Sequence, residues 1–155
     1  MERHSDMWVV TDFKDSEDEL IRRDFEIMVS TAQELNLESV LDRIVVQIYN
    51  EDMYDIVKDI YPFQSWIYTL YKNVYFGGNS NTFREYVRFC YSNGIKNITM
   101  WKNLARPELI KIADEYGIMV YVHTEDDIEN AKKLMELGVS GIYTNILTSD
   151  KFEEE

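Results

Sequence analysis

The chain has 155 residues and a formal net charge of −13, with 45% apolar and 14% aromatic residues. This length suits one domain, and the apolar fraction is sufficient for a packed core. The negative charge argues against nucleic acid and anionic membrane surfaces as partners, because both require clustered Lys and Arg side chains.

Six apolar runs are predicted as strands, and they alternate with helical patterns along the chain. The strands are expected at residues 7–14, 43–49, 65–71, 95–101, 119–123 and 140–144. The five helices are expected at about residues 16–36, 51–60, 82–92, 107–117 and 125–137. Pro107 suits the first turn of the fourth helix, and Gly117 and Gly138 suit the ends of the fourth and fifth. Thr124 is the expected cap of the fifth helix.

The alternation of strands and helices predicts a parallel α/β architecture made of the β/α units of a TIM-type barrel. A complete barrel takes about 200 residues or more, so this barrel would be incomplete. We expect a single domain over residues 1–155, with an acidic tail at 149–155. An open flavodoxin-like sheet remains an alternative, because the pattern of elements alone does not separate it from part of a barrel.

From the sequence as given we expect neither a secretory leader nor a membrane span. The chain starts Met1-Glu-Arg-His-Ser-Asp6, which is not the charged and then apolar leader of a signal peptide. No apolar run approaches the roughly 18–20 residues of a membrane span. The single cysteine, Cys90, cannot form an internal disulfide. We therefore expect the chain as given to be cytoplasmic.

Asp12 and Lys14 form the sharpest pair of candidate site residues. In parallel α/β proteins ligands bind beyond the carboxyl ends of the strands, and residues two apart on a strand share a face. A carboxylate can ligate Mg²⁺ or Ca²⁺, and a lysine can hold a phosphate oxygen. The alternative is a salt bridge at the strand end, since one carboxylate does not make a metal site.

Four later residues at strand ends are candidate substrate contacts. Gln47 can donate an amide hydrogen bond to a substrate oxygen, or it can be paired within the protein. Tyr49 and Trp101 can form an aromatic wall for a glycerol or sugar group, or they can pack in the core. His123 can act as acid, base or ligand, or it can bond a backbone carbonyl at the rim.

The last third of the chain carries the most specific pattern. Val139-Ser-Gly-Ile-Tyr-Thr-Asn145 resembles the closing Val-Asp-Gly-Ile-x-Thr-Asp of the glycerophosphodiester phosphodiesterase family, a PI-PLC-like phosphodiesterase TIM barrel. Ser140 and Asn145 stand in place of the two acids. Val120-Tyr-Val-His-Thr124 resembles the family strand that commonly ends Trp-Thr, with His123 in the tryptophan place.

Two earlier segments extend the resemblance to residues 7–147. Val10-Thr-Asp-Phe-Lys14 resembles the family's Glu-x-Lys strand, with Asp12 in place of the usual glutamate. Ile44-Val-Val-Gln-Ile-Tyr49 resembles the strand that follows it. The chain would then be the C-terminal portion of the family's barrel.

The resemblance implies a phosphoric diester hydrolase of lipid metabolism that cleaves glycerol phosphodiesters with a divalent metal, Mg²⁺ or Ca²⁺. It implies that Asp12 is a metal ligand and Lys14 a phosphate contact, and that the substrate pocket is lined by Gln47, Tyr49, Trp101 and His123. The family's two catalytic histidines lie in an opening segment with His-Arg and His-Asp pairs. The chain contains neither pair, so no catalytic residue is assigned.

The parent activity and the activity of this chain are therefore separate expectations. The whole enzyme would hydrolyse glycerol phosphodiesters, whereas the isolated chain should have little or no activity. The alternative is a non-catalytic half-barrel that serves as an interaction or folding module. An incomplete barrel leaves two sheet edges open, so we also expect a homodimer.

Overall fold

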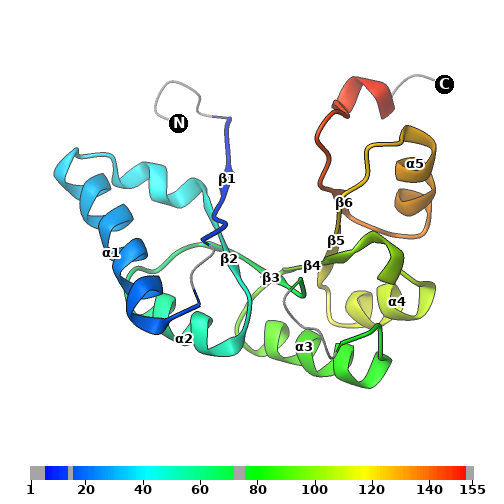
Figure 1. The fold of residues 1–155 in the computed structure, drawn as a ribbon, viewed down its shortest axis with the longest axis horizontal. Coiled ribbons are helices and arrows are strands. Elements are labelled where there is room, and N and C mark those ends of the chain that lie inside the picture. Colours follow the sequence, from blue (N-terminus) through cyan, green and yellow to red (C-terminus); the bar gives the residue numbers. More distant parts are fainter. Residues whose placement is uncertain (1–5, 14–15, 72–75, 153–155) are drawn as a thin grey trace. The chain divides into compact units, whose positions relative to one another are not determined.

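A computed structural model describes residues 6–13, 16–71 and 76–152. Six strands in this part of the chain form a sheet in the order β1-β2-β3-β4-β5-β6. Their bounds are β1 Val9–Val10, β2 Ile44–Ile48, β3 Ser65–Thr69, β4 Asn97–Trp101, β5 Met119–His123 and β6 Gly141–Ile142 (Figure 1). The pairs β1 with β2, β4 with β5, and β5 with β6 are parallel.

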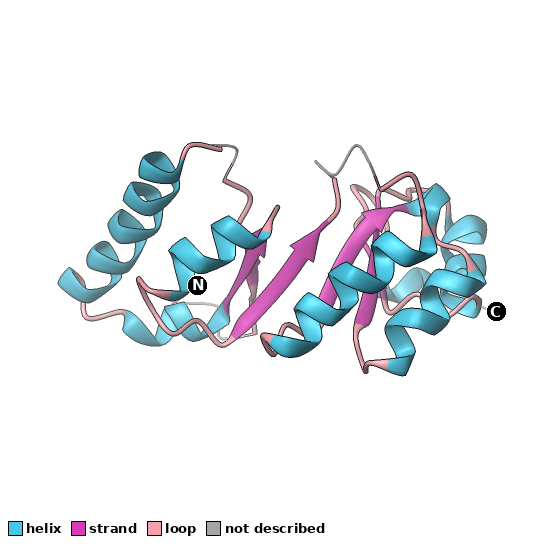
Figure 2. Cartoon of the chain, turned by 90° about the horizontal axis from the view of Figure 1, so that it is seen from below, coloured by secondary structure: helices cyan, strands magenta, loops and turns pink. Residues whose placement is uncertain are grey.

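Helices alternate with these strands, as Figure 2 shows. The α-helices of the described residues are α1 Asp18–Glu34, α2 Glu51–Lys58, α3 Ser80–Ser92, α4 Pro107–Glu115 and α5 Ile128–Glu136. Three short 3-10 helices accompany them: η1 Glu38–Arg43, η2 Lys102–Leu104 and η3 Ser149–Phe152. The last of these lies within the predicted acidic tail. The fold is an incomplete α/β barrel, which confirms the predicted fold class.

The strand order excludes the open flavodoxin-like alternative. In that fold the first strand lies between the second and the third, so the order reverses at a switch point. Here the strands follow the order of the chain without reversal, as they do in a β/α barrel.

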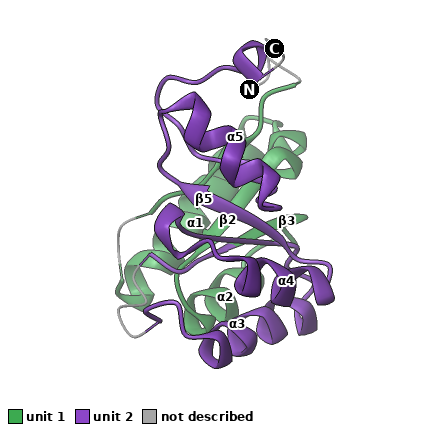
Figure 3. Cartoon of the chain, turned by 90° about the vertical axis from the view of Figure 1, so that its right-hand side faces the viewer, with its two compact units in different colours: residues 1–67 green, residues 68–155 purple. Residues whose placement is uncertain are grey.

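The chain divides into two compact units, which Figure 3 colours separately. The first unit is Met1–Ile67 and the second is Tyr68–Glu155. The prediction of a single domain over residues 1–155 stays a prediction.

The core of the first unit lies against one face of α1. Ile21, Phe25 and Val29 are buried and are spaced four residues apart, so they share one side of the helix. The Phe25 ring meets the rings of Phe13 and Phe63 edge to face, at centroid distances of 4.8 and 5.9 Å. Phe25 thereby anchors the segment that follows β1, which carries Asp12.

The second unit is built on the parallel pair of β4 and β5, in register from Asn97 opposite Met119 to Trp101 opposite His123. Side chains on a strand point alternately to the two faces of the sheet. Val120 and Val122 are buried in the core on one face of β5. Tyr121 and His123 are therefore turned to the opposite face.

The two outermost strands are shorter than predicted. At β1 the regular ladder ends at Val10, because the backbone N–H of Gln47 donates to the hydroxyl of Thr11 at 3.0 Å instead of to a backbone carbonyl. At β6 the backbone N–H groups of Ser140 and Tyr143 still donate to β5, at 2.7 and 2.8 Å. The chain then turns away, so only Gly141–Ile142 is regular strand.

The start of the fifth helix also differs from the prediction. Asp127, and not Thr124, is the N-cap of α5, and its carboxylate accepts the backbone N–H of Asn130 at 2.9 Å. The predicted helix residue Glu125 folds inward instead and is buried. In the described ranges no helix is both long and apolar enough to cross a bilayer.

Candidate functional site

A hydrogen-bonded group of three predicted site residues lies at the carboxyl ends of β1 and β2, in the first unit. The amide nitrogen of Gln47 donates to Asp12 Oδ1 at 3.0 Å and to the Tyr49 hydroxyl oxygen at 3.1 Å. The Tyr49 hydroxyl donates in turn to Asp12 Oδ1. The two neighbouring strands thus fix the position of the Asp12 carboxylate.

Burial explains why this group is ordered. Gln47 and Tyr49 are only 9% and 5% exposed, and buried polar groups are costly unless they are hydrogen-bonded. The carboxylate of Asp12 satisfies both side chains, while Asp12 itself lies at the exposed end of the strand. For Gln47 the sequence allowed either a substrate contact or a partner within the protein, and in the structure its amide has partners within the protein. The predicted substrate contacts of Gln47 and Tyr49 stay predictions.

Lys14, the predicted phosphate contact, lies outside the described residues. The described residues hold no group of three or more His, Cys, Asp or Glu side chains that could bind a metal ion. A hard cation such as Mg²⁺ or Ca²⁺ requires about six oxygen ligands. These ligands include backbone carbonyls and water as well as carboxylates, so Asp12 would be one ligand among several, and its predicted role as a metal ligand stays a prediction.

An aromatic group surrounds His123 at the carboxyl ends of the strands in the second unit. The imidazole centroid lies 4.8 Å from the ring of Trp101, 5.9 Å from that of Tyr71 and 6.4 Å from that of Tyr143. Trp101 and Tyr71 are 44% and 51% exposed, so their rings are open to a ligand and are not core side chains. The structure thus brings Trp101 and His123 together, and their predicted contacts with a substrate stay predictions.

His123 has one satisfied and one unsatisfied ring nitrogen. Nδ1 lies 3.2 Å from the Thr99 hydroxyl, whereas Nε2 is buried and has no hydrogen-bond partner among the described residues. An unpaired buried polar atom costs roughly 1–3 kcal/mol. A ligand that reached Nε2 with a hydroxyl or phosphate oxygen would remove this cost. Burial also lowers the pKa of His123, so the imidazole is mostly neutral at pH 7.

The lowered pKa predicts a pH-dependent loss of stability. Below the ordinary value of 6.5, the unfolded chain binds a proton at His123 that the folded chain does not yet bind. The unfolding free energy should therefore fall as the pH drops from 6.5 towards the lower folded pKa. The variant His123→Phe keeps an aromatic ring and should lose this part of the pH dependence. Urea unfolding between about pH 7 and pH 5 measures it.

The carboxylates supply an internal control for this experiment. Hydrogen bonds lower the pKa values of Glu125 and Asp126 below their ordinary 4.5 and 3.8. Their contribution to stability is lost only as the pH falls below about 4.5, and it should be lost equally in both proteins. An unchanged slope between pH 6.5 and 5 in His123→Phe would show that His123 is not desolvated.

The sequence did not reveal two polar networks beyond the strand ends of the second unit. The Glu125 carboxylate accepts the backbone N–H groups of Asp126 and Asp127, each at 3.0 Å, and pairs with Lys102 at 3.0 Å. The carboxylate of Asp126 accepts the Thr144 hydroxyl and the Asn145 backbone and side-chain N–H groups, at 2.7–2.8 Å. The second network ties the loop after β6 to the loop after β5.

Similarity to known proteins was found at the level of structure. No family model matches the sequence, and no curated protein matches it. The structure is similar to a protein assigned as a glycerophosphodiester phosphodiesterase from Galdieria sulphuraria, with a TM-score of 0.68 and 18% identity over 89% of this chain and 53% of that one. It is also similar to a glycerophosphodiester phosphodiesterase from Parabacteroides distasonis, with a TM-score of 0.64 and 15% identity over 92% of this chain and 55% of that one.

A third similar structure is a protein assigned as a glycerophosphoryl diester phosphodiesterase from Silicibacter pomeroyi. Its TM-score is 0.65, with 14% identity over 88% of this chain and 45% of that one. The chain thus spans about half the length of the structures it matches. Its fold is similar to that of part of each of these structures.

Proposed function

We propose that this chain is the C-terminal, substrate-binding part of a glycerophosphodiester phosphodiesterase-like barrel, whose whole form hydrolyses glycerol phosphodiesters with the help of a metal. The similar fold supports the kind of barrel. The observation that carries the proposal is the Asp12 carboxylate, which Gln47 and Tyr49 hold at the carboxyl ends of two adjacent strands. Ligands of β/α barrels bind at this end of the strands.

Each predicted residue has a role in this proposal. Asp12 would contribute one ligand to a Mg²⁺ or Ca²⁺ ion, and Gln47 and Tyr49 would orient its carboxylate. Trp101 and His123 would contact the glycerol part of the substrate, through the open indole ring and the neighbouring imidazole ring. Lys14 would contact the phosphate.

The isolated chain should bind glycerol phosphodiesters but hydrolyse them little or not at all. General acid and base groups contribute typically about 10²–10⁴-fold to a rate, and a candidate group must reach the proton that it transfers. His123 is neutral near pH 7 and is set among aromatic rings, so it suits a binding role better than that of a general acid. No other histidine lies among the described residues.

A turnover assay tests this division of roles. The purified chain, incubated with glycerophosphodiesters and Mg²⁺ or Ca²⁺, should release no glycerol phosphate above the rate in buffer. Asp12→Ala should behave in the same way, as should Asp42→Ala, which removes an exposed carboxylate of the first unit. Clear turnover by the chain that disappears only in Asp12→Ala would contradict the proposed lack of activity.

The alternative function is a non-catalytic half-barrel that acts as an interaction or folding module. It would rest on the fold alone, which spans about half the length of the similar structures. Such a module should bind neither metal nor glycerol phosphate. Binding of glycerol phosphate that depends on Asp12 therefore separates the two functions.

We also propose that the chain pairs with a second copy of itself. Among the strands that the structure describes, β1 and β6 are outermost in the sheet and each pairs with one strand, and open strand edges favour association. Near β1, the side chains of Trp8 and Val10 are 56% and 39% exposed. Light scattering at micromolar concentration should give twice the mass of the 18.5 kDa chain, whereas a stable monomer would contradict the pairing.

A further inference from the structure

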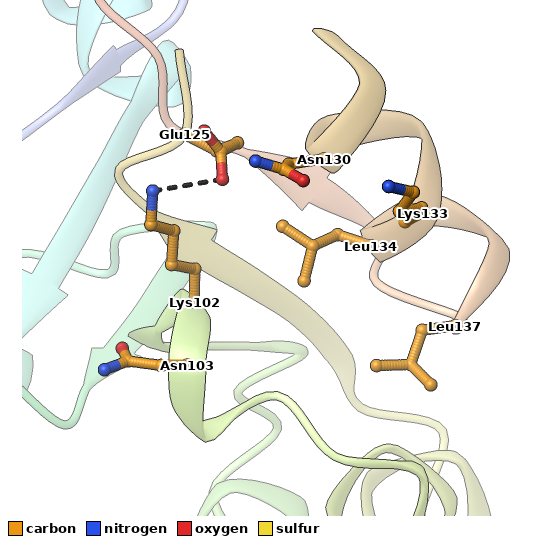
Figure 4. A pocket seen from close by; sticks show the side chains of 7 residues that line it. All are labelled: Lys102, Asn103, Glu125, Asn130, Lys133, Leu134 and Leu137. Carbon is orange, nitrogen blue, oxygen red and sulfur yellow. Dashed lines mark hydrogen bonds and ion pairs between the residues drawn. The ribbon is translucent and has the colours of Figure 1, made fainter. Parts of the chain in front are cut away.

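A cavity of about 320 Å³ lies in the second unit, apart from the predicted site residues (Figure 4). It opens between the 3-10 helix η2, which follows β4, and the helix α5. Its lining residues are Lys102, Asn103, Glu125, Asn130, Lys133, Leu134 and Leu137. The volume is at the lower end of the range of small-molecule pockets, which is about 300–1,000 Å³.

Glu125 is the fixed element of this cavity. It is 5% exposed, and its Oε1 atom accepts the backbone N–H groups of Asp126 and Asp127. Its other oxygen accepts the ammonium of Lys102 at 3.0 Å (Figure 4). An ammonium has three protons, and this bond engages one of them. The buried carboxylate thus holds the Lys102 ammonium at the cavity with protons left for a ligand.

The helix α5 brings a second cation to the same cavity. Asn130, Lys133, Leu134 and Leu137 recur at spacings of three and four residues, so they share one face of the helix. Lys133 is exposed and forms no ion pair with any residue that the structure describes. The lining therefore contains two lysines and one carboxylate, which gives it an excess of positive charge in a chain with a net charge of −13.

The remaining lining is apolar and amide. Leu134 and Leu137 are half-buried and provide an aliphatic surface, and the side chains of Asn103 and Asn130 provide amide donors. We propose that this cavity binds a small organic oxyanion, with a phosphate or carboxylate head between the two lysines and a short aliphatic body on the leucines. This site is independent of the proposed phosphodiester function.

Titration of the full-length chain, followed by ¹H–¹⁵N NMR, tests the site with n-butyl phosphate as the probe. We expect saturable shifts of the backbone amides of Asn130, Lys133 and Leu134. Lys133→Gln should weaken binding about tenfold, which corresponds to one charge-assisted hydrogen bond. Lys96→Gln is the matched control, because Lys96 is an exposed lysine at the other end of β4 and should leave the affinity unchanged.

Three further probes, butyrate, inorganic phosphate and n-butanol, test the contributions of the charged head and the aliphatic body separately. Butyrate should bind at the same residues, because its carboxylate can accept hydrogen bonds from the same lysine ammonium groups; a failure of butyrate to bind would contradict the proposed carboxylate ligands. Inorganic phosphate and n-butanol should each bind more weakly than n-butyl phosphate. The proposal is overturned if the shifts do not saturate, if they map elsewhere, if Lys96→Gln weakens binding as much as Lys133→Gln, or if inorganic phosphate binds equally well.

Discussion

Replacing Phe25 with alanine is expected to lower the free energy of unfolding by about 3–5 kcal/mol. The Phe25 side chain is fully buried, and it meets Phe13 and Phe63 edge to face. Its removal costs the transfer of a large apolar group, and it leaves a cavity that the surrounding rings can fill only in part. Urea denaturation followed by circular dichroism measures the change.

The matched control is Ile27→Ala, two residues further along α1, because Ile27 is 55% exposed. Ile27→Ala should change the free energy of unfolding by no more than about 0.5 kcal/mol. The Phe25→Ala variant should also shift the backbone NMR signals of Phe13 and Asp12, because Phe13 directly follows Asp12 and packs on Phe25. A loss below about 1 kcal/mol would show that the ring is not part of a packed core.

Glu125→Ala, in the second unit, should lower the free energy of unfolding by about 2–3 kcal/mol. The change leaves two backbone N–H groups without their acceptor and removes the partner of Lys102. Glu125→Gln keeps an acceptor for the backbone and loses only the charge, so its effect should be smaller. Thermal and urea unfolding of the two variants give the comparison.

Glu129→Ala provides the control, because Glu129 is an exposed acid in the first turn of the same helix. Removing it should cost no more than about 1 kcal/mol, which is the usual contribution of an acid to a helix dipole. Equal effects of Glu125→Ala and Glu129→Ala would contradict the inward position of Glu125.

The fold could be predicted from the sequence where short signals bound each element. The strand Met119–His123 was predicted to the residue, because Gly117 ends the preceding helix and polar residues follow the apolar run. The predicted strand at residues 7–14 was too long, since sequence hydrophobicity does not show that the Thr11 hydroxyl takes over a ladder hydrogen bond. Local side-chain hydrogen bonds of this kind compete with regular structure and depend on the neighbouring strand.

The candidate site could be predicted only in part, for the same reason. Alternation along one strand placed Gln47 and Tyr49 on a common face. Their contact with Asp12 depends on the register between strands, in which Val10 lies opposite Val45. No pattern within a single segment specifies that register. The Trp101 and His123 contact likewise results from the register of β4 and β5.

Glu125 was missed because its surroundings in the sequence suggest an ordinary helix start. Glu125, Asp126 and Asp127 are three successive acids, and acids are favoured throughout the first turn of a helix. Which of the three folds inward is decided by the position of Lys102, which is 23 residues away in sequence. The wrong prediction of Thr124 as the cap follows from the same ambiguity.

Calorimetric titration with glycerol 3-phosphate tests most directly whether the Asp12 carboxylate belongs to a phosphodiester-binding site. With Mg²⁺ present, the chain should bind glycerol 3-phosphate, Asp42→Ala should bind it equally, and Asp12→Ala should not. Without Mg²⁺, Asp12→Ala should bind glycerol 3-phosphate more tightly than the unaltered chain does, because the Asp12 carboxylate then repels the phosphate. Binding by Asp12→Ala that equals that of the unaltered chain in the presence of Mg²⁺ would contradict the proposed function, and so would no binding by either protein.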